Sequence, residues 1–193
     1  RYPEICRIDT IGYSIDGRLV LAARLHSGNY LEGDRPVMMY SSTMHGDEPV
    51  GYVLMLMLLD TMLESYGTIS EYTELIDKTV ILINPLSNPD GTYYLGDTTI
   101  YGSIRENAGY TDLNRDFPDC RESLNYSYEG REQETIIMMK YLEKYRPSIS
   151  ANFHGGAEVI NYPWDRSWTN SLGQKVIKYH SDMDWFISIS KEY

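Results

Sequence analysis

The chain has 193 residues, enough for one domain, and 42% of them are hydrophobic and 23% charged. This balance excludes disordered, collagen-like and coiled-coil proteins, and no apolar run approaches the roughly 20 residues of a membrane helix. The net charge of -11, from 28 acidic and 17 basic residues, repels nucleic acid. We therefore expect a single domain over residues 1–193 without a membrane span or a nucleic-acid partner, and the oligomeric state stays open.

Two apolar stretches near the N-terminus predict a β-hairpin. Ile5 to Ile15 and Leu19 to Leu25 flank the Asp16-Gly17 pair, which is a strong turn signal. The next apolar run, Pro36 to Ser41, is short and typical of a buried strand.

A helix and a second buried strand follow. Apolar residues on nearly every face of Pro49–Leu63 predict a buried helix that begins near Asp47, with Asp47 as a candidate cap. Thr79–Ile83 predicts a buried strand that ends at Asn84-Pro85. From there to about Tyr128 the pattern is irregular, and so long a connection is usually functional.

The C-terminal part again alternates helix and strand. Gln133–Lys144 predicts a helix, Ser148–Phe153 a third buried strand, and Asp182–Lys191 a final helix. The alternation indicates an α/β fold, a mixed, mostly parallel twisted sheet with helices on both faces. Ligands of such sheets bind at the carboxyl ends of the strands.

Two groups of potential metal ligands follow predicted strands. His45-Gly46-Asp47-Glu48 comes after Pro36–Ser41, and His154-Gly155-Gly156 comes directly after Ser148–Phe153. Two histidines and one glutamate with an open fourth position are a catalytic zinc arrangement. A lone H-x-x-E pair is a weak signal, so chance spacing stays an alternative.

The remaining histidines and cysteines predict no second site. His26 and His180 lack comparable neighbours and are interpreted as ordinary histidines. Cys6 and Cys120 are too few for a disulfide framework or a Cys-rich zinc site, and the sequence leaves their state open.

The stretch 105–118 places two arginines and two asparagines in an irregular loop with the sequence R-E-N-A-G-Y-T-D-L-N-R-D-F-P. Guanidinium groups suit the recognition of carboxylates and the stabilisation of oxyanions. The alternative is that these arginines pair with acidic residues of the surface.

Together, four motifs resemble those of the zinc metallocarboxypeptidases, in the same order and spacing. They are H-G-D-E-P-V-G at 45–51, N-P-D-G at 88–91, the stretch 105–118, and F-H-G-G-A at 153–157. The likeness is to the carboxypeptidase E, N and D branch and its bacterial relatives. It implies their fold, peptide substrates with a free C-terminal carboxylate, and a secreted, periplasmic or cell-surface location.

The resemblance also implies roles for single residues. One Zn²⁺ would be held by His45, Glu48 and His154, and would promote attack of water on the last peptide bond. Asp112 would accept the other ring N–H of His45 and fix its tautomer. Arg105 would polarise the scissile carbonyl and stabilise the oxyanion.

Substrate recognition is implied in the same way. Asn114 and Arg115 would bind the terminal carboxylate, and Asp165, eleven residues after His154, would face the terminal side chain and favour Lys or Arg. The alternative is that Asp165 caps the turn at 164–166 or pairs with its neighbour. The Pro163-Trp164 peptide bond is expected to be cis.

In the family, the general base is a glutamate on a late strand, and a tyrosine on a mobile loop covers the substrate. Neither has a counterpart among these 193 residues, so we expect a catalytic domain that is incomplete at its C-terminal end. Three functions stay open: a carboxypeptidase, another zinc amide hydrolase such as a murein-peptide amidase or deacylase, and an inactive carboxylate-binding module.

Overall fold

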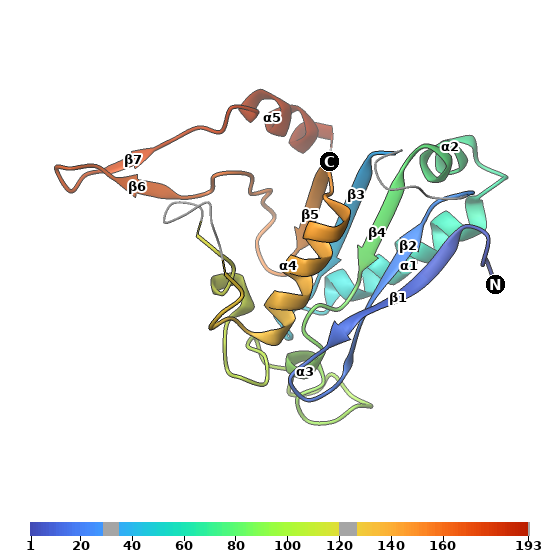
Figure 1. Cartoon of the computed structure of the whole chain (residues 1–193), viewed down its shortest axis with the longest axis horizontal. Coiled ribbons are helices and arrows are strands. Elements are labelled where there is room, and N and C mark those ends of the chain that lie inside the picture. Colours follow the sequence, from blue (N-terminus) through green and yellow to red (C-terminus); the bar gives the residue numbers. More distant parts are fainter. Residues whose placement is uncertain (29–34, 120–126, 193) are drawn as a thin grey trace. The chain divides into compact units, whose positions relative to one another are not determined.

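A computed structural model describes residues 1–28, 35–119 and 127–192 (Figure 1). The chain forms two compact units, Arg1–Gly155 and Gly156–Tyr193. The larger unit carries the five-stranded sheet.

The larger unit is built on a five-stranded mixed sheet with the order β1-β2-β4-β3-β5. The strands are β1 (Cys6–Tyr13), β2 (Leu19–Leu25), β3 (Val37–Ser42), β4 (Val80–Asn84) and β5 (Ile149–Phe153). β1 with β2 and β2 with β4 are antiparallel, whereas β3 is parallel to β4 on one side and to β5 on the other. The carboxyl ends of β3, β4 and β5 therefore lie at one edge of the sheet.

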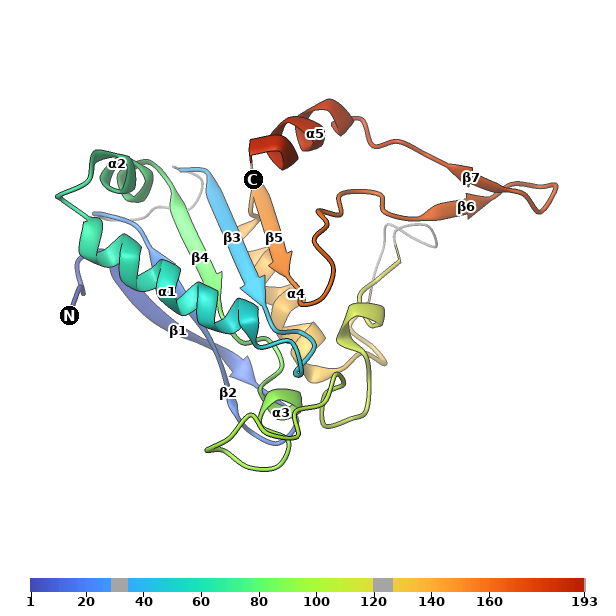
Figure 2. The same ribbon diagram turned by 180° about the vertical axis from the view of Figure 1, so that it is seen from behind.

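Helices cover both faces of this sheet, as the sequence predicts. The two views from opposite sides show α1 (Val50–Ser65) in front of one face and α4 (Gln133–Tyr145) in front of the other (Figures 1 and 2). α2 (Ser70–Lys78) leads into β4, and the irregular stretch after β4 contains α3 (Pro89–Thr92) and the 3-10 turn η1 (Leu113–Arg115).

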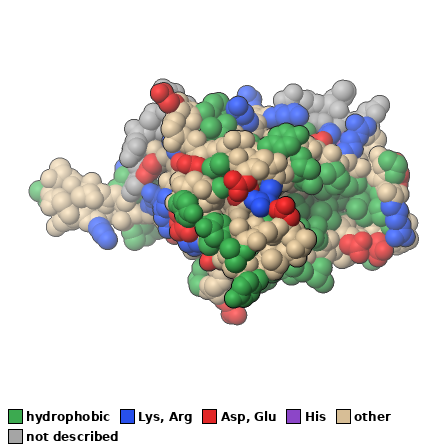
Figure 3. Space-filling view, turned by 90° about the horizontal axis from the view of Figure 1, so that it is seen from below, with side chains coloured by type: hydrophobic (Ala, Val, Ile, Leu, Met, Phe, Trp, Pro, Cys, Tyr) green, Lys and Arg blue, Asp and Glu red, His purple; other side chains and the backbone are tan. Residues whose placement is uncertain are grey.

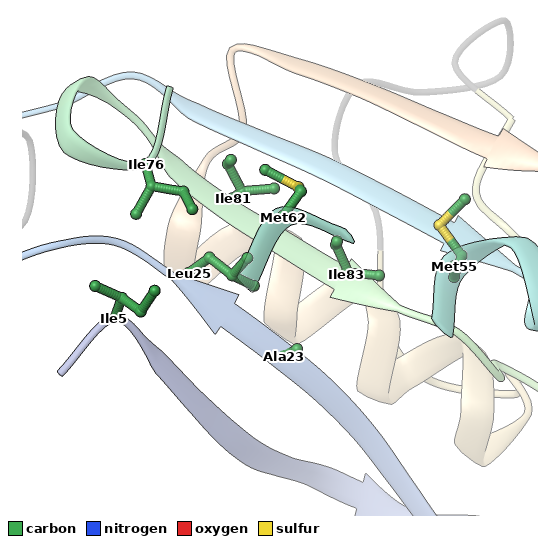
Figure 4. Packing of buried hydrophobic residues seen from close by; sticks show 8 residues of the cluster. All are labelled: Ile5, Ala23, Leu25, Met55, Met62, Ile76, Ile81 and Ile83. Carbon is green, nitrogen blue, oxygen red and sulfur yellow. The ribbon is translucent and has the colours of Figure 1, made fainter. Parts of the chain in front are cut away.

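The side chains of β4 fill two cores because they alternate across the sheet. Ile81 and Ile83 belong to the cluster beside α1 and α2, which includes Met55 and Met62 (Figure 4). Val80 and Leu82 pack on the other face with residues of α4. Burial on both faces explains why β4 reads as a continuous apolar run.

The predicted hairpin is present. Its second strand has the predicted bounds, whereas its first strand ends at Tyr13 and not at Ile15. Ser14 and Ile15 lie outside β1 and belong to the turn: Ser14 N donates to Arg18 O at 2.8 Å and Gly17 N to Ser14 O at 2.9 Å, whereas Ile15 N donates to Glu134 Oε1 at 3.1 Å. The side chain of Ser14 donates to Asp90 Oδ1 at 2.7 Å. Gly17 takes a left-handed φ of 81°, as the turn requires.

The prediction that Asp47 caps a buried helix is wrong. α1 begins at Val50, its N-cap residue is Pro49, and no side chain caps it. Its first two turns expose Val50, Val53, Leu54 and Met57. Only one side of the helix contacts the sheet, so an apolar residue on every face does not mean burial on every face. Hydrophobic side chains also reach the surface shown in Figure 3, among acidic and basic ones.

The smaller unit contains a two-stranded antiparallel sheet, β6 (Ser167–Thr169) with β7 (Lys175–Ile177), and the helix α5 (Met183–Glu192). The peptide bond between Pro163 and Trp164 is cis, as expected. Among the described residues of the whole chain, no single helix is long and apolar enough to cross a membrane. Taken together, α1 and α2 have sufficient length and apolar character, but the chain bends by 102° between them.

Two methionines of α1 test this packing. Met62→Ala should lower the free energy of unfolding by about 2–5 kcal/mol, because it leaves a cavity in the core. The matched change Met57→Ala should alter it by less than about 0.5 kcal/mol, since Met57 is 61% exposed and Met62 only 2%. Urea denaturation measures both, and equal losses would contradict the assigned orientation of α1.

Candidate metal centre

The loop after β3 carries the first two candidate ligands. Thr43 takes a left-handed φ of 55°, which is unfavourable for a β-branched residue. Two hydrogen bonds hold it there: Thr43 Oγ1 donates to Glu48 O at 3.2 Å, and Asn88 N donates to Thr43 O at 3.1 Å. This sharp turn lets His45 enter the protein at the end of the sheet, where its ring is only 2% exposed.

Three side chains converge on one point. His45 Nδ1 lies 3.0 Å from Glu48 Oε1, and His154 Nδ1 lies 2.9 Å from Glu48 Oε2 and 3.1 Å from His45 Nδ1. His154 directly follows β5, so the parallel pairing of β3 with β5 brings the two histidines together across 109 positions of sequence. Side-chain exposure rises from 2% at His45 to 17% at Glu48 and 33% at His154, so the cluster opens on the His154 side.

Asp112 orients the buried ring of His45. Its Oδ1 lies 3.0 Å from His45 Nε2, and the backbone N–H of Asn114 donates to the same oxygen at 2.9 Å. Arg105 contacts both carboxylates: Nε and Nη2 donate to Asp112 Oδ2 at 3.1 and 3.0 Å, and Nη1 donates to Glu48 Oε1 at 3.3 Å.

Both carboxyl groups are held in the ionised form. Burial by itself raises the pKa of Glu48, but hydrogen bonds from Gly155 N and from His154 outweigh it and bring the pKa below its ordinary value. Burial likewise opposes ionisation of Asp112, and hydrogen bonds from His45 and Arg105 outweigh it and lower its pKa. Because ionised Asp112 only accepts, its contact with His45 calls for a proton on Nε2. With the proton there, Nδ1 would offer its electron pair to a cation lying between it and the Glu48 carboxylate.

The donor set fits a small divalent cation. The ligand atoms of His45, Glu48 and His154 all lie within 4.8 Å of one another. In a tetrahedral zinc site with bonds of about 2.0–2.1 Å, neighbouring ligands lie about 3.3 Å apart, close to the 2.9–3.1 Å separations found here. Two imidazoles and a carboxylate are also the ligand types that zinc accepts.

The segment that carries Asp112 also carries Asn114 and Arg115. Both belong to η1, whose N-cap residue Asp112 accepts a hydrogen bond from Asn114 N through its side chain. Arg115 is exposed, and its Nη1 donates to Asn114 O at 3.0 Å. Asp112 thus connects this pair to the candidate metal ligands, since its Oδ1 contacts both Asn114 N and His45 Nε2.

Three other residues discussed above are not among the ligands of this cluster. Asp165 belongs to the smaller unit, where it is exposed with a left-handed φ of 39°, so its expected role in recognition stays a prediction. His26 is buried outside the three-ligand cluster. Cys6 is a free thiol whose pKa is raised by burial, and Cys120 lies outside the described residues.

Sequence reasoning missed a set of buried polar residues that support the site. Asn107 donates to Glu132 and Glu134, each at 2.9 Å, and so fastens the loop of Arg105 to the start of α4. Burial raises the pKa of Glu134. Asn88 is fully buried between loops. The N-P-D-G motif signalled its importance, but no pattern in the sequence shows what its side chain contacts.

Comparison with known proteins decides the family. The model of the family described as "Zinc carboxypeptidase" matches residues 1–193, the whole chain. The chain belongs to the zinc carboxypeptidase family. Mouse carboxypeptidase M is 40% identical over 167 residues, and human carboxypeptidase D is 35% identical over 168 residues; each match covers 85% of this chain.

Relatives of this zinc carboxypeptidase chain are longer than it is. The matched region is 37% of mouse carboxypeptidase M and 12% of human carboxypeptidase D. A solved structure, carboxypeptidase A from Helicoverpa armigera, superposes with a TM-score of 0.75 at 22% identity, over 99% of this chain and 48% of that one. This likeness confirms the predicted fold class.

Proposed function

We propose that the full-length protein is a zinc metallocarboxypeptidase that hydrolyses the C-terminal peptide bond of peptides. The observation that carries the proposal is the convergence of His45, Glu48 and His154 beside Arg105 in a member of the zinc carboxypeptidase family. A secreted, periplasmic or cell-surface location belongs to the same proposal.

One zinc ion would be held by His45 Nδ1, the carboxylate of Glu48 and His154 Nδ1. Bound there, zinc supplies a Lewis acid that polarises a carbonyl and lowers the pKa of a water ligand toward about 7. Asp112 keeps the His45 ring in the ligating tautomer through the 3.0 Å contact with Nε2. No residue of this chain is assigned as the general base.

Arg105 is positioned to stabilise an oxyanion. Asp112 holds Nε and Nη2 of its guanidinium, whereas Nη1 lies 3.3 Å from Glu48 Oε1, an oxygen of the proposed metal ligand. Nη1, the nitrogen that Asp112 does not hold, is therefore the donor available to a developing negative charge beside the metal. The guanidinium remains fixed by Asp112 meanwhile, so little reorganisation is needed.

Asn114 and Arg115 would bind the free carboxylate of the substrate. Arg115 is exposed, and a guanidinium binds a carboxylate through two parallel hydrogen bonds. We further propose that Asp165 favours a terminal Lys or Arg, since a carboxylate attracts a cationic side chain and repels an acidic one.

The metal assignment predicts the zinc content of histidine variants. His45→Ala and His154→Ala should each lose stoichiometric zinc, because three protein ligands become two. His26→Ala, which removes another buried histidine, should retain one equivalent. Metal analysis after dialysis measures this, and full zinc content in both site variants would refute the assignment.

The carboxylate assignment predicts a dependence on the substrate terminus. Arg115→Ala should lower kcat/KM of the full-length protein on free C-terminal peptides by about tenfold or more, because a charge-assisted contact is lost. The wild-type protein should cleave C-terminally amidated peptides far more slowly than free ones. Equal turnover of free and amidated peptides would instead favour another zinc amide hydrolase, and no turnover an inactive binding module.

The specificity assignment predicts an order among terminal residues. Matched peptides ending in Arg or Lys should have a higher kcat/KM than those ending in Phe, Leu or Glu, and Asp165→Ala should reduce that advantage. A preference that survives Asp165→Ala would show that this aspartate is not its source.

A further inference from the structure

Asn88 lies where three segments meet at the end of the sheet. Its side chain is fully buried, and Nδ2 lies 3.1 Å from Met44 O, 3.1 Å from Glu106 O and 3.4 Å from Arg105 O. Its Oδ1 accepts from Gly91 N at 2.9 Å. One carboxamide therefore links the residue before His45 to the loop that begins at Arg105.

Two loops, residues 43–46 and 104–106, and the short helix α3 with its N-cap residue, residues 88–92, form a junction with backbone packed against backbone. Gly46 N donates to Arg105 O at 3.2 Å, and Ile104 N donates to Gly91 O at 2.9 Å. A Cβ atom on Gly46 would lie 2.2 Å from the carbonyl carbon of Gly91 and 2.5 Å from Ile104 O, and one on Gly91 would lie 2.3 Å from Glu106 O. Only glycine permits this approach at both positions.

A further side-chain hydrogen bond fastens the same junction. Thr92 is fully buried, and its Oγ1 donates to Gly46 O at 3.0 Å. The carbonyls of Met44 and Gly46, on either side of His45, are thus both bound by the segment that contains N-P-D-G.

The junction sets the distance between two halves of the site. One loop carries His45 and Glu48, and the other leads through Arg105 to Asp112. Their contacts, His45 Nε2 to Asp112 Oδ1 at 3.0 Å and Arg105 Nη1 to Glu48 Oε1 at 3.3 Å, cross between the loops. Hydrogen bonds weaken steeply when donor and acceptor separate or turn, so a small shift of either loop would weaken both contacts.

We propose that Asn88 is a positioning residue for the metal centre: its carboxamide keeps the His45 loop in register with the Arg105 loop, so that Asp112 can orient His45. The inference rests on the proposed zinc site, and Asn88 itself lies outside the ligand set. Loss of the Asn88 carboxamide should therefore lower the affinity for the metal as well as the stability of the fold.

The test uses a matched pair of buried asparagines. Asn84 is also fully buried, but its side chain contacts β2 and its own segment: Nδ2 donates to Leu21 O at 2.8 Å, and Oδ1 accepts from Ser87 Oγ at 2.5 Å. The carboxamide of Asn88, in contrast, reaches across to the carbonyls of Met44 and Arg105. Asn88→Ala and Asn84→Ala should both lower stability, because each removes the hydrogen bonds of a fully buried carboxamide. Only Asn88→Ala should weaken Zn²⁺ binding, by about tenfold, in competition with a chromophoric chelator under conditions where all proteins are folded.

A second pair keeps the test decisive if Asn88→Ala does not fold. Thr92→Val removes the hydroxyl that binds Gly46 O, whereas Thr135→Val removes a buried hydroxyl that has no hydrogen-bond partner among the described residues. Thr92→Val should weaken Zn²⁺ binding severalfold and Thr135→Val should leave it unchanged. Equal Zn²⁺ affinities within each folded pair would overturn the inference, whereas a wild-type protein that binds no Zn²⁺ would overturn the proposed function and the inference with it.

Discussion

The site depends on the parallel pairing of β3 with β4 on one side and β5 on the other. Ser41 lies opposite Asn84 of β4 and Asn152 of β5, so the three strands reach the same edge of the sheet together. The chain leaves each strand there and enters the candidate site: His45 after β3, Asn88 after β4 and His154 after β5. Backbone hydrogen bonds of the ladder thus set the spacing of groups that are distant in sequence.

Charge compensation allows these groups to be partly buried together. Two carboxylates, two imidazoles and one guanidinium form one chain of contacts in which each group lies within hydrogen-bond distance of at least one other. Desolvation opposes ionisation of Glu48 and Asp112, yet their hydrogen bonds lower both pKa values. Glu48 therefore stays ionised although burial is unfavourable for its charge. A carboxylate binds a metal cation in this ionised form.

The two wrong predictions, the Asp47 cap and the full burial of α1, share a physical cause. Both concern contacts made in the tertiary structure, whereas the helix itself was predicted. Asp47 is a good capping residue by type, but α1 begins after Pro49, and the turn is held instead by Thr43, Glu48 and Asn88. The apolar residues of α1 suggested full burial, but a helix on one face of a sheet buries only the side that contacts the strands. Propensity describes a residue and its neighbours in sequence, whereas burial is decided by what packs against them.

The sequence by itself determined the elements of the sheet, the placement of both metal-ligand groups after strands, and the identity of the arginine loop, since apolar periodicity and motif spacing are local properties. It also indicated the family, because the four motifs occur in a fixed order. Only the tertiary structure decided the position of Asn88 between the His45 and Arg105 segments, and only it gave the distances of the contacts, including the 3.0 Å between His45 and Asp112 that the resemblance implied as a contact. The His45–Asp112 and Asn88–Met44 contacts join residues 67 and 44 positions apart. Their geometry follows from strand register and close packing of backbone, which no local pattern encodes.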